Sequence, residues 1–193
     1  MGAADVVPGR ECGACRVCCI APTIDDPEIQ KQSGTRCRHC REGGDGGCAI
    51  YDARPTPCRV FYCAWRRLAS FPDDWRPDLT GVFGTLDAAT IDGKQGVVLT
   101  LTLLHNEMNI IRHRPFVEFI RATVLEGLPI YLALAGPPGH KPLRTFLNTP
   151  AMSEAARASD EDVCRLLHDA VHAIKAHPVL AYSLRHQGND TGI

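Results

Sequence analysis

Hydrophobic and polar residues alternate with a period of two in the middle of the chain. Over residues 97–104, three leucines alternate with Thr100 and Thr102, and this pattern predicts a strand with one buried face. Residues 82–91 form a second candidate strand, and the turn at 92–96 between the two contains an Asp-Gly pair. Two such strands across an Asp-Gly turn indicate an antiparallel hairpin.

Two later segments have the 3.6-residue period of amphipathic helices. The first begins at Pro115 and is expected to end at Gly127, because proline favours a helix start and glycine a helix end. The second is a longer helix capped by Ser159 or Asp160. Its apolar stripe consists of Val163, Leu166, Leu167, Ala170, Val171 and Ile174. Between the helices, residues 129–135 predict a third, buried strand.

The first third of the chain differs from the rest because it is rich in cysteine and glycine and poor in aliphatic residues. Such a segment cannot bury enough apolar surface to fold alone and needs a staple such as metal. We therefore expect an α+β protein. A small irregular cysteine-rich metal-binding module at 10–67 would be followed by a small antiparallel sheet with helices at 80–178, packed against it. The ends, 1–9 and 187–193, are expected to be flexible.

Nine of the ten cysteines lie in this first part, and their spacing indicates metal binding. Thiolates are strong ligands for zinc and for iron–sulfur iron. Adjacent Cys18 and Cys19 must point in different directions, so they serve two metals, or one ligates while the other packs. Four ligands close one site, and nine thiols exceed one site. The candidate ligands are Cys12, Cys15, Cys18, Cys19, Cys37, Cys40, Cys48, Cys58 and Cys63.

Composition favours metal over a disulfide framework. Hydrophobic residues make up 45% and charged residues 22% of the chain, as in ordinary globular proteins, and the net charge is −1. This charge gives no general attraction to nucleic acid or to an anionic membrane. No secretory signal is recognisable, and no apolar run approaches about 18 residues. A cytoplasmic, reducing compartment is therefore expected, where clustered cysteines bind metal more often than they form disulfides.

The order of the cysteines and their neighbours resembles a known family. Residues 12–19 have the spacing Cys-x-x-Cys-x-x-Cys-Cys, Cys37 follows, and residues 48–61 read Cys-Ala-Ile-Tyr-Asp-Ala-Arg-Pro-Thr-Pro-Cys-Arg-Val-Phe. This pattern is similar to that of the YkgJ-type CxxCxxCC cysteine cluster family, which is described as zinc- or iron-chelating. The resemblance covers about residues 10–67 and implies a ligand set without Cys40 and Cys63. That set is Cys12, Cys15, Cys18, Cys19, Cys37, Cys48 and Cys58.

Several other residues are candidates for a role at this centre. Arg54 and Arg59 are the candidate cofactor-binding residues, since cationic donors near sulfur tune a cluster, although both positions also suit a structural role. His39 is a weaker ligand candidate. The aromatic residues expected to cover the metal are Tyr51, Phe61, Tyr62 and Trp65.

Outside the module the chemistry is sparse. His168 and His172 have the spacing of a helical metal pair, but a solvated helix face explains them as well. Cys164 is expected to be a small buried hydrophobic residue.

Three functions remain open from the sequence. The first is a metal-binding protein that holds an iron–sulfur cluster or zinc. The second is a redox enzyme or electron carrier with an iron–sulfur cluster, and the third is a metal chaperone or storage protein. The α+β part is expected to recognise an unknown protein or small-molecule partner, with no specific nucleic acid and no membrane. Whether the chain is an enzyme stays open.

Overall fold

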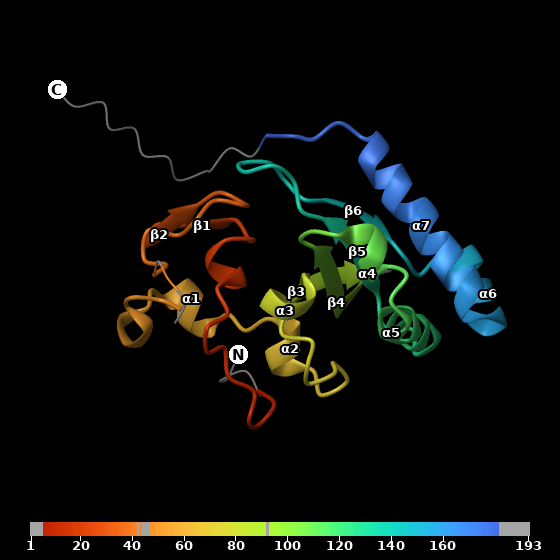
Figure 1. Cartoon of the computed structure of the whole chain (residues 1–193), viewed down its shortest axis with the longest axis horizontal. Helices are drawn as coiled ribbons and strands as arrows, with labels where there is room; N and C mark the ends of the chain where they lie inside the picture. Colours follow the sequence, from red (N-terminus) through yellow and green to blue (C-terminus); the bar gives the residue numbers. More distant parts are fainter. Residues whose placement is uncertain (1–5, 42, 44–46, 92, 182–193) are drawn as a thin grey trace.

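The computed structural model describes residues 6–41, 43, 47–91 and 93–181. Two parts lie next to each other (Figure 1): a loop-rich part that carries most of the cysteines, and a four-stranded sheet whose far side is covered by helices. This arrangement confirms the α+β class. Of the two ends expected to be flexible, residues 1–5 and 187–193 lie outside the described residues.

The sheet consists of β3 (Val82–Ile91), β4 (Lys94–Leu103), β5 (Ile130–Leu134) and β6 (Leu143–Phe146), in that order. β3 and β4 pair antiparallel and confirm the hairpin. β5 runs parallel to β4, so the sheet is mixed and not purely antiparallel as predicted. The reason is the connection, because helical segments carry the chain from the end of β4 back to the start of β5. β6, which the sequence pattern did not predict, pairs antiparallel with β5.

The alternation along β4 separates two faces of the sheet. Leu99, Leu101 and Leu103 are fully buried in the main core. Because directly paired residues share a face, Leu132 of β5, opposite Leu101, lies on this helix side as well. Thr100 and Thr102 lie on the other face, together with their partners Thr85 and Phe83 on β3. We call this second face the threonine face.

The helices cover the leucine side. They are α4 (Glu107–Ile110), α5 (Arg114–Leu125), α6 (Pro150–Ala158) and α7 (Asp160–Ala176). α5 agrees with the predicted helix, and Gly127 beyond its end has a φ of 75°, which glycine adopts easily. In α7 the hydroxyl of Ser159 accepts a hydrogen bond from the backbone nitrogen of Asp162 at 3.1 Å, which confirms the predicted cap.

The cysteine-rich part consists of short elements and loops. They are η1 (Val17–Cys19), β1 (Ile24–Asp26), β2 (Ile29–Lys31), η2 (Tyr51–Ala53), α1 (Thr56–Val60) and α2 (Ala64–Arg67). The short helix α3 (Pro77–Thr80) lies between this part and the sheet. Within the described residues, the buried cluster of the cysteine-rich part itself contains Ile29, Cys37 and Cys40, with a few half-buried neighbours. This cluster is small for a segment of this length, so it buries little apolar surface of its own.

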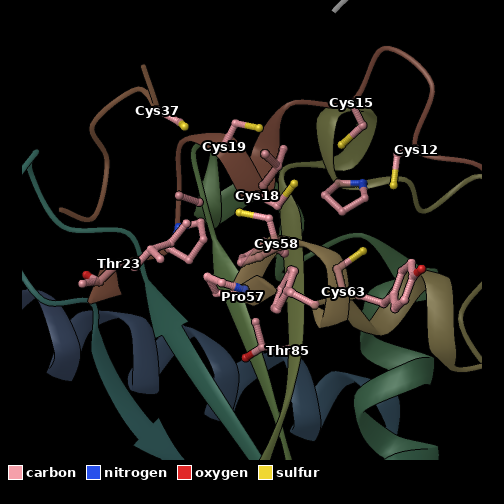
Figure 2. A pocket seen from close by; sticks show the side chains of 18 of the residues that line it. Cys12, Cys15, Cys18, Cys19, Thr23, Cys37, Pro57, Cys58, Cys63 and Thr85 are labelled. Atoms are coloured by element: carbon pink, nitrogen blue, oxygen red, sulfur yellow. The ribbon is translucent and has the colours of Figure 1, made fainter. Parts of the chain in front are cut away.

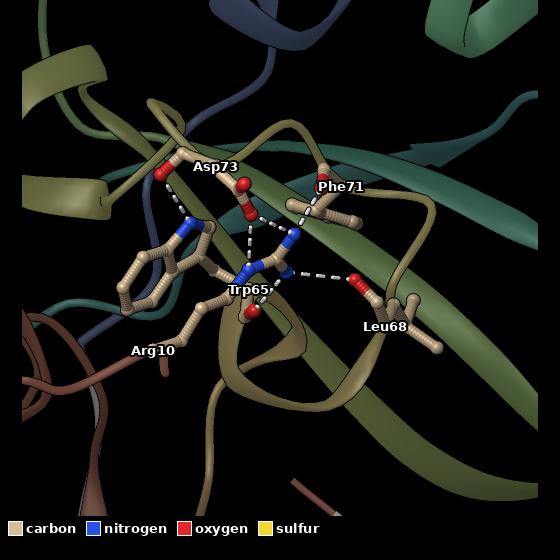
Figure 3. Close-up of polar contacts among 5 residues, drawn as sticks. All are labelled: Arg10, Trp65, Leu68, Phe71 and Asp73. Atoms are coloured by element: carbon tan, nitrogen blue, oxygen red, sulfur yellow. Dashed lines mark hydrogen bonds and ion pairs between the residues drawn. The ribbon is translucent and has the colours of Figure 1, made fainter. Parts of the chain in front are cut away.

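Helix α2 and Arg10 join the two parts. Ala64 and Trp65 of α2 belong to the main core, and a Cβ atom at Gly84 of β3 would lie only 2.7 Å from the Cβ of Ala64. The buried guanidinium of Arg10 donates to the carbonyl oxygens of Trp65, Leu68 and Phe71 at 2.5, 2.9 and 2.5 Å (Figure 3). Arg10 therefore ties the start of the cysteine-rich part to the segment that precedes the sheet.

Candidate functional site

A cavity of about 800 Å³ lies between the cysteine-rich part and the threonine face of the sheet. We call it the thiol cavity, because eight of the nine clustered cysteines line it. Figure 2 shows Cys18 and Cys58 near its middle, with Thr85 of the sheet below them. The cysteines that line it are Cys12, Cys15, Cys18, Cys19, Cys37, Cys48, Cys58 and Cys63.

Local backbone structure brings the first four thiols together. The backbone nitrogen of Cys15 donates to the carbonyl oxygen of Cys12 at 2.8 Å, which closes a tight turn. Gly13 in this turn has a φ of 51°, a conformation that other residues rarely adopt. Cys18 and Cys19 follow in the 3-10 helix η1. The sequence predicts that these adjacent side chains diverge, but their thiols are hydrogen-bonded to each other.

The remaining thiols come from loops and helix starts. The backbone nitrogen of Cys37 donates to the carbonyl oxygen of Cys19 at 2.8 Å, and Cys40 and Cys48 form an isolated β-bridge. Cys58 lies in α1, and Cys63 immediately precedes α2. All ten cysteines of the chain are free, so none of them forms a disulfide.

The thiols form two neighbourhoods that meet at Cys18 and Cys19. In the first, negative charge on Cys12 or Cys15 raises the pKa of Cys18, and negative charge on Cys12 raises the pKa of Cys63. In the second, negative charge on Cys37, Cys19 or Cys48 raises the pKa of Cys58, and Cys19 raises the pKa of Cys40. We call Cys12, Cys15, Cys18 and Cys63 the first thiol set. The second thiol set is Cys19, Cys37, Cys40, Cys48 and Cys58.

Neighbouring Cys18 and Cys19 have opposite pKa shifts. The thiol of Cys18 donates a hydrogen bond to Cys19, and this bond raises the pKa of Cys18 and lowers that of Cys19 to about 6. Burial raises the pKa of Cys15 to about 12. Burial also raises the pKa values of Cys40, Cys58 and Cys63.

Two cations lie close to the second thiol set. The ammonium of Lys31 donates to the carbonyl oxygens of Ile20 and Thr35 at 2.7 and 3.0 Å. Burial lowers the pKa of Lys31 to about 8, while the neighbouring thiolates oppose this shift. The guanidinium of Arg54 stacks on the ring of Tyr51 at 3.8 Å, lines the cavity and helps to lower the pKa of Cys19.

The other candidates occupy varied positions. Arg59 is exposed and donates to the hydroxyl of Thr56 at 3.1 Å. Phe61 and Tyr62 line the cavity, as does Tyr51, which is half exposed. Trp65 instead packs in the main core, where its indole nitrogen donates to the carbonyl oxygen of Asp73.

The histidine candidates lie in separate places. His39 lines the cavity, and its Nε2 accepts a hydrogen bond from Arg38 at 3.0 Å. His168 and His172 lie next to each other on α7, with 3.3 Å between their Nε2 atoms. Cys164, on the same helix, was expected to be buried; it is half-buried and packs against the main core.

The thiols surround the cavity but do not converge. In the part of the chain that the structure describes, no three His, Cys, Asp or Glu side chains are arranged to hold a metal ion. The donor chemistry nevertheless suits zinc and iron–sulfur iron, because every cysteine is free and eight thiols face one space.

Sequence reasoning missed the threonine face. Thr85, Thr100 and Thr102 line the thiol cavity from the sheet side. The alternation of leucine and threonine along β4 predicts a strand with one buried face. The same pattern fits a threonine face that is exposed to water and one that lines a cavity. Lys31 and Arg10 were also missed, since no local motif marks either residue.

Comparisons with known proteins add no relative. No protein-family model matches the chain, and neither a curated protein nor a solved structure matches it. Among the described helices, none combines the length and apolar character needed to cross a bilayer. The candidate site is therefore argued from its own residues.

In the reduced, metal-free protein, we expect iodoacetamide to react with Cys19 before the other buried thiols. The thiolate is the nucleophile, and a pKa of about 6 leaves Cys19 mostly deprotonated near neutral pH, whereas Cys15 stays protonated. Labelling should slow as the pH falls below about 6, because Cys19 then gains its proton. Pulsed alkylation with fragment mass spectrometry separates Cys18 from Cys19.

The variant Cys18→Ala supplies the control for this experiment. It removes the thiol that donates to Cys19, so the pKa of Cys19 should rise and its labelling near pH 6 should slow. Unchanged labelling of Cys19 in this variant would contradict the assigned hydrogen bond.

Proposed function

We propose that the cysteine-rich part is a metal centre that holds an iron–sulfur cluster or zinc through its thiolates. The observation that carries the proposal is the gathering of eight free thiols around one cavity. These thiols come from segments up to 51 residues apart in the sequence, between Cys12 and Cys63. The spacing that resembles the YkgJ-type CxxCxxCC family supports the same function, and we propose that the chain is a member of it.

The two thiol sets support two binding positions. The first thiol set has four members, which matches the four ligands of a closed zinc site or of a cluster. The second thiol set has five, and Cys40, the only one of the five that does not line the thiol cavity, is the surplus member. Cys18 and Cys19, whose thiols are hydrogen-bonded to each other, lie where the two sets meet, and each would serve its own set. Binding requires the thiols of each set to converge.

The surrounding charges favour thiolates over thiols. A metal bound by four thiolates carries a net negative charge, which is costly to bury without a compensating cation. Lys31 and Arg54 lie beside the second thiol set and would offset that charge. The raised pKa values of Cys15 and Cys18 belong to the metal-free thiols, and a bound cation would lower them because it stabilises the thiolate.

Cobalt titration tests this function directly. We expect the reduced, metal-free protein to bind two Co²⁺ ions per chain under anaerobic conditions, one for each thiol set. Each ion should produce the intense near-ultraviolet charge-transfer absorption of a cobalt–thiolate bond, and zinc should displace it. Cys164→Ser is the matched control, because Cys164 lies in α7 and packs against the main core. A protein that gives no cobalt–thiolate absorption would contradict the proposal.

A further inference from the structure

One hydroxyl group beneath the thiol cavity lacks a hydrogen-bond partner among the described residues. Thr100 lies on β4, lines the cavity and is only 7% exposed. Among the residues that the structure describes, none forms a hydrogen bond with its buried Oγ1 atom. By contrast Thr123, which is buried to a similar extent in α5, donates its hydroxyl to the carbonyl oxygen of Phe119 at 2.8 Å.

An unpaired buried hydroxyl is an unfavourable choice for stability alone. Valine has nearly the same shape as threonine, suits a strand equally well and leaves no polar atom to satisfy. The hydroxyl of Thr100 therefore points to a ligand that supplies the missing hydrogen bond. Thr85, its direct partner on β3, also lines the cavity, and Figure 2 shows it below Pro57 and Cys58.

The size and lining of the cavity define the ligand. Pockets for small organic molecules measure about 300–1,000 Å³, and the thiol cavity measures about 800 Å³. Its walls include the apolar side chains of Ile24, Phe61 and Phe83. Three acidic and four basic residues line it, so the two signs of charge nearly balance. The lining therefore does not favour a strongly charged ligand of either sign.

We propose that the thiol cavity binds a small, uncharged organic molecule whose carbonyl or hydroxyl group pairs with Thr100. This position places the molecule beside the clustered thiols. Its role as a substrate of a metal centre rests on the proposed function, whereas its binding in the cavity rests on the cavity and Thr100 alone.

Prodan, a flat and uncharged naphthyl ketone, is a suitable probe because its fluorescence shifts to the blue in apolar surroundings. We expect the full-length protein to bind it with this shift. Thr100→Val should weaken binding about 5- to 10-fold, the effect of losing one neutral hydrogen bond. Thr145→Val is the matched control, because Thr145 pairs with Leu132 on the helix side of the sheet and should leave binding unchanged.

A second variant tests the location of the probe without removing a polar group. Ala133 lines the cavity from β5, and Ala133→Leu would place a larger side chain in the space that the probe needs. We expect this variant to bind prodan much more weakly while its circular dichroism spectrum stays native. Native-like binding by Ala133→Leu would overturn the assignment of the cavity.

The metal content of the same samples separates the two proposals. Absence of prodan binding, or equal affinities of Thr100→Val and Thr145→Val, would overturn the ligand inference and leave the metal centre intact if metal is present. Binding that depends on Thr100 in a protein without affinity for metal would support the cavity inference and contradict the proposed function.

Discussion

Replacing Arg10 by alanine is expected to lower the free energy of unfolding by about 3–5 kcal/mol. The guanidinium of Arg10 is buried and donates to three backbone carbonyl oxygens, one in α2 and two in the segment that follows it. Without it, these carbonyl groups lose the hydrogen bonds that the guanidinium donates, and the start of the cysteine-rich part loses its side-chain ties to the main core. Urea unfolding followed by tryptophan fluorescence measures the change, because Trp65 lies at this contact.

Asp73→Ala is the matched control for Arg10. The carboxylate of Asp73 accepts from Arg10 at 2.8 Å, but its side chain is 91% exposed, against 6% for Arg10. An ion pair with one partner in water contributes little, so this variant should lose less than about 1 kcal/mol. Equal destabilisation by the two variants would contradict the view that the carbonyl contacts, and not the ion pair, carry the stability.

Removing one thiol from each set is expected to remove one metal at a time. Cys15→Ser alters the first thiol set and Cys58→Ser the second, and serine oxygen is a far poorer ligand for zinc or cluster iron. Each variant should therefore hold half the metal of the unaltered protein, and the double variant should hold none. Elemental analysis of purified protein measures the content per chain.

Limited proteolysis adds a structural readout to these cysteine variants. Since metal binding and folding are coupled in small cysteine-rich modules, residues 10–67 should become protease-sensitive in the double variant. Cys164→Ser should keep full metal content and full protection. Complete metal loss in both single variants would indicate one shared centre and contradict the two thiol sets.

The sheet and the long helices were predictable because their signals are local. The alternation in β4 and the 3.6-residue stripe of α7 are each contained in one segment, so the sequence determines them. β6 was missed because four residues, Leu143–Phe146, are too few to show a period. α6 was not predicted either, although its start has the residues typical of a helix N-terminus. Thr149 accepts a hydrogen bond from the backbone nitrogen of Met152, and Pro150 follows as the first helical residue.

The site was only partly predictable for the same physical reason. Spacing identified the nine clustered cysteines, but it does not tell which sulfur atoms become neighbours across loops. The approach of the threonine face to Cys18 and Cys58 depends on how α2 packs on β3, a contact between distant segments. Arg10 likewise acts on residues at least 55 positions away, so no local pattern announces its role.

The most direct test of the metal centre is elemental analysis of the protein purified without oxygen. Iron, zinc and acid-labile sulfide are measured on one sample together with its visible spectrum. We expect one of two results. The first is zinc alone in a colourless sample, and the second is iron with matching sulfide and the broad visible absorption of an iron–sulfur cluster. In both cases we expect one zinc ion or one cluster for each thiol set. A folded protein with fully reduced cysteines and none of these elements would contradict the account.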